Sequence, residues 1–204
     1  YIDFVNKLDI PSSKHILLTS ENQFDLEKIM SEINIPCIVK PNNGGSSIGV
    51  SKVNHIYDLE NKIKIAFKEC NEVLIEDFLF GKEVSVGVIQ KKDERIILPV
   101  TEIISENELF DYGAKYLGQS TEITPANISN EEKNLIHKYI NIIYDNIEFN
   151  GFTRSEFIIV DGIPHILETN TIPGFTKQSI IPQQIEAHGL SVKDEINYQI
   201  ESIL

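Results

Sequence analysis

Residues 151–170, GFTRSEFIIVDGIPHILETN, are the stretch that most strongly constrains the fold. Two runs rich in β-branched and aromatic residues are joined by Asp161-Gly162, which predicts a β-hairpin. Four polar side chains interrupt the apolar pattern of the two strands: Arg154, Glu156, Glu168 and Asn170. Because side chains alternate along a strand, the two polar residues of each strand share one face of the sheet.

Whether the two pairs meet depends on the length of the turn. A three-residue turn at Val160-Asp161-Gly162 pairs Ile159 with Ile163 and brings the four polar side chains to one face, whereas a two-residue turn separates the pairs. If they meet, two carboxylates and an amide oxygen form a hard oxygen site suited to Mg²⁺, and Arg154 is left to bind a phosphate or a developing oxyanion. The alternative is an exposed sheet face with one ordinary salt bridge. The E-T-N spacing and the turn TIPGFT after it favour the site.

A loop rich in glycine and serine follows a short strand in IVKPNNGGSSIGV, residues 38–50. Lys40 lies at the end of the strand, and the loop amides, together with the hydroxyls of Ser46 and Ser47, can donate several hydrogen bonds to phosphate oxygens. Neither GxxxxGK[ST] nor GxGxxG is present, so the loop carries neither of those phosphate-binding signatures. The competing interpretation is an ordinary flexible hairpin.

The string EDFLFGKE, residues 76–83, contains two acids on either side of an apolar turn. Backbone groups of such a linker can bind the edge of an adenine, and carboxylates such as Glu76 and Glu83 can accept hydrogen bonds from ribose hydroxyls. Taken alone, the two acids are also consistent with solvated side chains on a hairpin.

The remaining pattern predicts helices around a largely antiparallel meander of strands between residues 72 and 103. Helices are expected before residue 34 from a Thr19/Ser20 cap, over 56–70, over 130–147 from a Ser129/Asn130 cap, and near 178–188 and 191–203. Residues 104–129 have no clear period, and a stretch of that length suggests a functional lid.

The composition excludes several classes of partner. The chain has 204 residues, with 18 Lys and Arg against 31 Asp and Glu, a net charge of −13. So acidic a surface repels nucleic-acid backbones and anionic lipid, so neither nucleic acid nor a membrane is expected as a partner. No apolar run approaches the roughly 18 residues of a membrane span. Cys37 and Cys70 lack metal-ligand spacing and are expected to be reduced, buried thiols of a cytoplasmic protein.

Taken together, these strings resemble the ATP-grasp fold and, within it, the D-alanine–D-alanine ligases. The resemblance runs in the family's order through PCIVKPNNGGSSIGVSKV, EVLIEDFLFGKEVSVGV, DYGAKYLGQSTEITPA and GFTRSEFIIVDGIPHILETNTIPGFTKQSI. It implies an α+β architecture of two lobes with largely antiparallel sheets that enclose a nucleotide site. Residues 1–80 are expected to form the central lobe and 81–204 the C-terminal lobe, and the family's N-terminal domain is not in this sequence.

The resemblance also assigns roles by position. The nucleotide contacts that it implies come from Lys40, Ser47, Glu76, Phe78, Leu79, Glu83, Lys115 and Leu167. The implied catalytic residues are Ser46, Tyr116, Arg154 and Gly174. The implied ligands of Mg²⁺ or Mn²⁺ are Glu156, Glu168 and Asn170, with Glu156 standing where many family members have Asp. Ser179 and Ile180 are expected to hold the second substrate.

The implied reaction is the ATP-dependent joining of two D-alanines through an acyl phosphate for peptidoglycan precursors, in a cytoplasmic protein that is a homodimer at full length. ATP and D-alanine are the implied small-molecule partners, and this chain alone is expected to be inactive. Two alternatives stay open: an ATP-binding module without ligation chemistry, and another ATP-grasp carboxylate–amine ligase, including one that takes D-serine. The string TIPGFTKQSI favours a ligase, because a nucleotide module does not need a serine that anchors a substrate carboxylate.

Overall fold

The computed structural model describes residues 1–21, 24–45, 47–105 and 120–202. Its contacts divide the chain into two compact units. The N-terminal unit is Ser13–Leu79 with Ser105–Thr121, and the C-terminal unit is Tyr1–Ser12, Phe80–Ile104 and Glu122–Leu204. The first twelve residues therefore group with the C-terminal strands, whereas the sequence assigned them to the lobe of residues 1–80.

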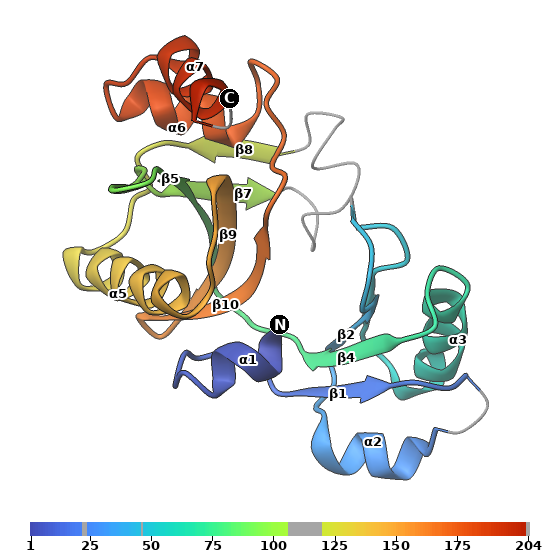
Figure 1. The fold of residues 1–204 in the computed structure, drawn as a ribbon. Coiled ribbons are helices and arrows are strands. Elements are labelled where there is room, and N and C mark those ends of the chain that lie inside the picture. Colours follow the sequence, from blue (N-terminus) through green and yellow to red (C-terminus); the bar gives the residue numbers. More distant parts are fainter. Residues whose placement is uncertain (22–23, 46, 106–119, 203–204) are drawn as a thin grey trace. The chain divides into compact units, whose positions relative to one another are not determined.

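The N-terminal unit is a four-stranded antiparallel sheet with two helices (Figure 1). The strands lie in the order β1 (His15–Leu18), β4 (Val73–Asp77), β2 (Cys37–Pro41) and β3 (Ser51–Val53). The helices are α2 (Leu26–Glu32) and α3 (Ile56–Phe67). The predicted start of α2 at Thr19/Ser20 is wrong, because the Asp25 carboxylate caps the helix by accepting hydrogen bonds from two backbone amides of its first turn.

Alternation along β2 and β4 gives this sheet two chemically different faces. Val39 and Ile75 point into an apolar core that also contains Leu59 and Ile63 of α3. The residues one position further along, which include Lys40 and Glu76, therefore point to the opposite face. One sheet face holds the unit together, and the other carries Lys40 and Glu76.

The C-terminal unit is built on a six-stranded sheet in the order β10-β9-β5-β7-β8, with β6 paired to β5. The strands are β5 (Lys82–Gln90), β6 (Arg95–Ile97), β7 (Thr101–Ser105), β8 (Ser120–Ile123), β9 (Gly151–Val160) and β10 (Ile163–Asn170). The helices are α1 (Ile2–Asn6), α5 (Asn130–Asn146), α6 (Ile180–Ala187) and α7 (Val192–Glu201). Antiparallel strands combined with separate helices confirm the predicted α+β class.

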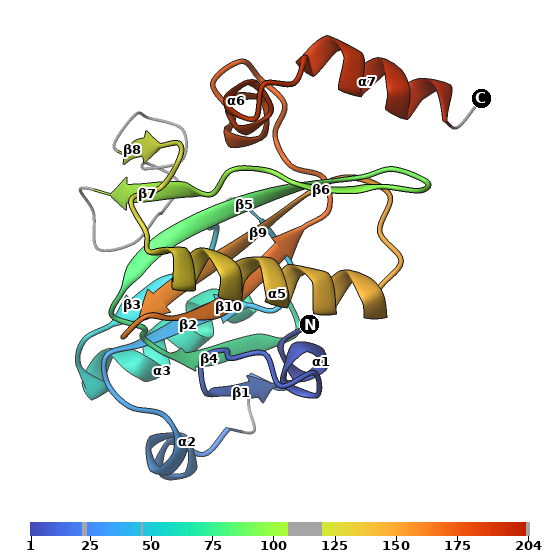
Figure 2. The same ribbon diagram turned by 90° about the vertical axis from the view of Figure 1, so that its left-hand side faces the viewer.

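The two faces of this sheet are covered by different helices (Figure 2). Val86 of β5 and Phe157 of β9 pack with Ile140 of α5 in the main core. On the other face, Ile89 packs with Ile181 of α6 in a smaller apolar cluster. Helix α6 therefore lies on the sheet face that also carries Ser85 of β5 and Glu156 of β9.

Helix α5 begins where the sequence predicted. Ser129 and Glu132 form a capping box, in which each side chain accepts a hydrogen bond from the other residue's backbone amide. The Tyr144 hydroxyl of α5 reaches Thr153 of β9, which adds a polar contact to the otherwise apolar packing of this helix on the sheet. Among the described residues, no helix is long and apolar enough to cross a membrane.

Candidate active site

The hairpin of β9 and β10 turns over two residues. Asp161 and Gly162 have φ values of 49° and 81°, the left-handed conformations that a type I′ turn requires. Ile163 therefore pairs with Val160, and the three-residue turn considered from the sequence does not form. Continued without interruption, this register would turn the polar end of β10 toward the face covered by α5.

A β-bulge at Leu167 prevents that outcome. Ile166 pairs with Phe157, but the next pair is Glu168 with Glu156, so Leu167 is the extra residue of β10. Beyond the bulge, Asn170 lies opposite Arg154. The extra residue reverses the alternation and places the four polar side chains on the face away from α5. Leu167, predicted as a nucleotide contact, is thus the residue that sets the register.

Arg154 and Glu156 form a shielded ion pair on β9. Arg154 Nη2 donates to Glu156 Oε1 at 2.6 Å, and the two side chains are 13% and 5% exposed. Within the described part of the chain, Arg154 Nε is buried without a hydrogen-bond partner. A guanidinium with donors left over in a partly desolvated setting is suited to bind an anion.

The donor set beside this pair consists of oxygens alone. The described residues contain no cluster of three or more His, Cys, Asp and Glu that could hold a metal, so a cation here needs the Asn170 amide oxygen together with Glu156 and Glu168. Asn170 Oδ1 accepts a hydrogen bond from the Ile172 backbone amide at 2.9 Å, which orients the amide. Carboxylate and amide oxygens fit Mg²⁺ or Mn²⁺ and not the thiolate-preferring metals.

The segment after β10 brings two further predicted residues together. A Cβ atom on Gly174 would lie 3.0 Å from Ser179 Oγ, so Gly174 and Ser179 are direct neighbours. Ser179 is the N-cap of α6, and its hydroxyl lies 3.1 Å from the backbone nitrogen and 3.0 Å from the hydroxyl of Thr176. Ile180, the first residue of α6, is buried. A serine hydroxyl at the start of a helix can bind a carboxylate.

Glu83 belongs to the same sheet face as Glu156. It lies on β5 two positions before Ser85, and Ser85 is opposite Glu156. Alternation therefore turns Glu83 and Ser85 the same way. The predicted ribose acid thus shares a face with the predicted metal ligands.

In the N-terminal unit, Lys40 and Glu76 form an ion pair. Lys40 Nζ lies 2.8 Å from Glu76 Oε2, and the two side chains are 22% and 5% exposed. Glu76 Oε1 is buried and has no hydrogen-bond partner among the described residues. The pair combines a cation for phosphates with a buried carboxylate oxygen that has accepting capacity left.

The linker after β4 is held by backbone and ring contacts. The Phe78 amide donates to the Pro36 carbonyl at 3.2 Å, and Lys52 Nζ lies 4.0 Å from the centroid of the Phe78 ring. Leu79 is the last residue of this part of the unit. Ser47 is described and has a φ of 57°. Ser46, Lys115, Tyr116 and most of the candidate lid fall in positions outside the described residues.

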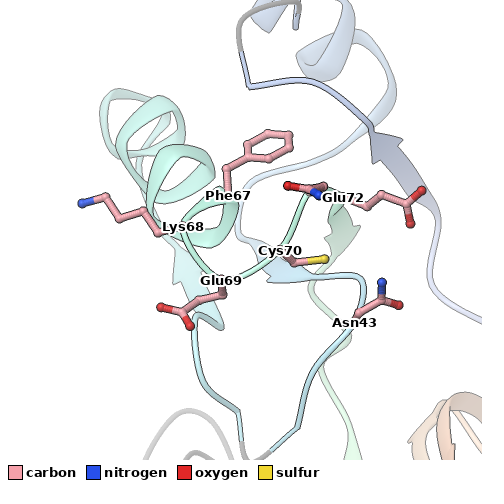
Figure 3. Close-up of a pocket in the computed structure, with 7 residues that line it drawn as sticks. Asn43, Phe67, Lys68, Glu69, Cys70 and Glu72 are labelled. Atoms are coloured by element: carbon pink, nitrogen blue, oxygen red, sulfur yellow. The ribbon is translucent and has the colours of Figure 1, made fainter.

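A cavity of about 480 Å³ lies beside the base of the glycine-rich loop (Figure 3). It is lined by Asn43, Phe67, Lys68, Glu69, Cys70, Asn71 and Glu72. Hydrogen bonds from the backbone amides of Glu72 and Asn43 lower the pKa of the Cys70 thiol. Of the lining residues, only Asn43 belongs to the loop predicted to bind phosphate.

Two charged residues near the predicted site were missed by the sequence analysis. Lys52 of β3 pairs with Ile38, one position from the core-facing Val39, and so shares the sheet face of Lys40 and Glu76. The other is Glu122 of β8, whose Oε2 accepts a hydrogen bond from Gln183 Nε2 at 3.1 Å. Burial raises the pKa of the Glu122 carboxyl, while the Gln183 hydrogen bond and nearby Arg154 lower it by less. Alternation in GVSKV could have identified Lys52; no local pattern identifies Glu122.

Comparison with known proteins establishes the family. Residues 4–201 match the family described as D-ala D-ala ligase C-terminus. This chain belongs to that family. The D-alanine–D-alanine ligase of Flavobacterium johnsoniae is 49% identical to this chain over 184 residues, covering 90% of this chain and 57% of the relative. The chain therefore spans less than two thirds of the length of this D-ala D-ala ligase.

Solved structures agree with the family and with the ATP-grasp fold. The VanG D-Ala:D-Ser ligase of Enterococcus faecalis has a TM-score of 0.85 and 29% identity, over 99% of this chain and 60% of that one. A Bacillus anthracis D-alanine–D-alanine ligase complexed with ATP has a TM-score of 0.80 and 25% identity, over 98% and 63%. The fold class predicted for this D-ala D-ala ligase family member is confirmed.

Proposed function

We propose that this chain is the ATP-binding and catalytic part of an enzyme that joins two D-alanines at the expense of ATP. The observation that carries the proposal is the single sheet face on which Glu168 opposes Glu156 and Asn170 opposes Arg154. A metal-binding set and an anion-binding guanidinium in direct register are what phosphoryl transfer to a carboxylate needs. The names of the relatives point to the same reaction.

A carboxylate resists attack by an amine until one of its oxygens becomes a leaving group. In the proposed mechanism, the first D-alanine carboxylate attacks the γ-phosphorus of ATP; the bond to the β,γ-bridging oxygen breaks, giving ADP and an acyl phosphate. Arg154 stabilises the charge on the transferred group and then on the tetrahedral intermediate. Glu156, Glu168 and Asn170 would hold Mg²⁺ or Mn²⁺, which neutralises phosphate charge when bound.

The second D-alanine is held through its carboxylate by Ser179 with Ile180 beside it, and its neutral amine attacks the acyl carbon. Phosphate leaves, and the amine loses its extra proton as the peptide bond forms. Gly174, which lies against Ser179, supplies a backbone amide to the oxyanion. The proposed nucleotide contacts are Lys40, Ser47, Glu76, Glu83, Leu167 and the linker residues Phe78 and Leu79. Ser46, Lys115 and Tyr116 keep their predicted roles near the phosphates.

The proposal is tested on the chain joined to the N-terminal domain that the family's longer members carry. Phosphate release and dipeptide formation are measured with ATP, Mg²⁺ and D-alanine, and in parallel with D-serine as the acceptor, because one structural neighbour is a D-Ala:D-Ser ligase. We expect one phosphate per D-alanyl-D-alanine. ATP binding with no amino-acid-dependent phosphate release would instead identify a nucleotide-binding module. The expected cytoplasmic location and homodimer stay predictions.

A further inference from the structure

Helix α6 is held on the polar sheet face by a buried glutamine. Gln184 has no exposed surface, and its Nε2 donates to the Ser85 carbonyl and to Thr101 Oγ1, both at 2.9 Å. Ser85 lies between Thr101 of β7 and Glu156 of β9. The side chain of Gln184 therefore bonds the sheet at the position directly beside a predicted metal ligand.

These two hydrogen bonds fix the rotation of α6 about its own axis and its distance from the sheet. The rest of its buried surface is apolar, formed by residues such as Ile181 and Ile185, and apolar contacts have little directional preference. Hydrogen bonds between buried groups are directional, and an unsatisfied buried partner is costly. A shift of α6 would break both bonds and leave the Ser85 carbonyl and Thr101 hydroxyl without this donor.

The backbone beneath the helix is shaped for the same close approach. Gly87 lies opposite Arg154, one alternation step from Ser85. A Cβ atom at Gly87 would come within 2.5 Å of both Gln184 Oε1 and Ile181 Cδ1, so any other residue would force these two side chains of α6 to move. Helix α6 therefore packs on β5 at the residue that lies opposite Arg154.

The preceding residue, Gln183, holds the start of the helix. Its Nε2 donates to the Gln178 carbonyl at 2.9 Å, immediately before Ser179, and to Glu122 Oε2 at 3.1 Å. Gln183 thus links the residue before the N-cap to β8, while Gln184, the next residue of the helix, bonds to β5 and β7. Consecutive glutamines fix the helix end that carries Ser179 and Ile180.

We propose that Gln184, assisted by Gln183, is a positioning residue for the second substrate. It fixes Ser179 and Ile180 relative to Arg154 and Glu156, so that the acceptor amine meets the acyl carbon in a productive orientation. The inference rests on the proposed function and deepens it by naming what sets the acceptor geometry. Gln184 does not touch substrate in this role.

The test compares Gln184→Met with Gln199→Met in the enzyme that carries the N-terminal domain. Methionine keeps the length of glutamine but cannot donate. Gln199 of α7 donates to the Gln90 carbonyl at 3.4 Å, so its replacement removes one hydrogen bond from a glutamine to a strand carbonyl elsewhere. For Gln184→Met we expect the KM for acceptor D-alanine to rise about tenfold and the KM for ATP to change less than about twofold. Phosphate release should exceed dipeptide formation, because acyl phosphate not captured by the amine is hydrolysed.

Gln199→Met should keep both KM values and one phosphate per dipeptide. Gly87→Ala is the second variant: its Cβ would displace the Gln184 amide and the Ile181 side chain while keeping the glutamine, and it should raise the acceptor KM in the same way. An unchanged acceptor KM in a folded Gln184→Met enzyme, or in Gly87→Ala should Gln184→Met not fold, would overturn the positioning role even if the melting temperature fell. A wild-type enzyme that makes no dipeptide would overturn the proposed function and this inference with it.

Discussion

Replacement of Arg154 by alanine is the most direct test of the proposed chemistry. The side chain is 13% exposed and donates to Glu156, and its buried Nε–H has no partner among the described residues, so the guanidinium can donate to a transferred phosphoryl group in a partly desolvated setting. One preorganised oxyanion donor is typically worth about 2.7–4 kcal/mol, a loss of roughly a hundredfold to a thousandfold in turnover. Nucleotide affinity should change by less than about tenfold, because Lys40 and Glu76 remain.

The same substitution leaves Glu156 without its cation. That carboxylate is 5% exposed and faces Glu168 on the neighbouring strand, so we expect a loss of stability of about 1–3 kcal/mol. Thermal unfolding by circular dichroism measures this loss, and activity is then assayed well below the new midpoint. Separating the two effects ensures that a drop in turnover reports chemistry and not unfolding.

The chain offers a matched control in its other arginine. Arg95 contacts Asp145 and the Asn141 side chain, each at 3.0 Å, and has no part in the proposed site. Phosphate release at saturating ATP and D-alanine should be within about twofold of wild type in Arg95→Ala. If Arg154→Ala also stayed within fivefold or so of wild type, Arg154 would play no part in phosphoryl transfer.

Three further predictions address the metal, the thiols and the alkaline limit. Glu168→Gln should weaken Mg²⁺ affinity about tenfold, measured by calorimetry with Mg²⁺ and ADP; unchanged affinity would move the metal site elsewhere. Cys70 should be alkylated faster than Cys37 near pH 8, as followed by peptide mass spectrometry, because backbone hydrogen bonds lower the pKa of Cys70 while burial raises that of Cys37 to about 11; equal rates would contradict this. Burial raises the pKa of Tyr144, so the unfolded chain loses that proton first and stability should fall as the pH rises above about 10. In Tyr144→Phe, that alkaline fall in the melting temperature should be smaller; an identical slope would refute the assignment.

In the hairpin of β9 and β10, the turn could be predicted from the sequence but the register of the strand ends could not. Asp161-Gly162 is a strong local signal for a two-residue type I′ turn, and the structure has that turn. By itself the turn would have sent Glu168 and Asn170 to the core face. The bulge at Leu167 returns these two side chains to the sheet face of Arg154 and Glu156. No sequence pattern at Leu167 or its neighbours predicts the bulge. Bulges depend on how the whole strand packs against its partners.

The helices around the site were predictable to different degrees. The capping box at Ser129 was readable because the donor and acceptor are three residues apart in the sequence. The start of α2 was misplaced because Thr19, Ser20 and Asp25 are all capable caps, and only packing decides which one is used. The hydrogen bonds of Gln184 could not be predicted from the sequence, because its partners lie on strands 99 and 83 residues away in the chain.

By itself, the sequence determined the helices, the largely antiparallel strands, the hairpin and the types of side chain available for phosphate and metal binding, because alternation, capping and turn preferences act over a few neighbouring residues. The α+β class came from the resemblance to a known family. Only the tertiary structure decided that Glu168 and Asn170 turn toward Glu156 and Arg154, and that Gln184 fastens α6 beside them. Register and helix seating are set by hydrogen bonds and packing between segments distant in the sequence, where a shift of one residue reverses every side chain of a strand.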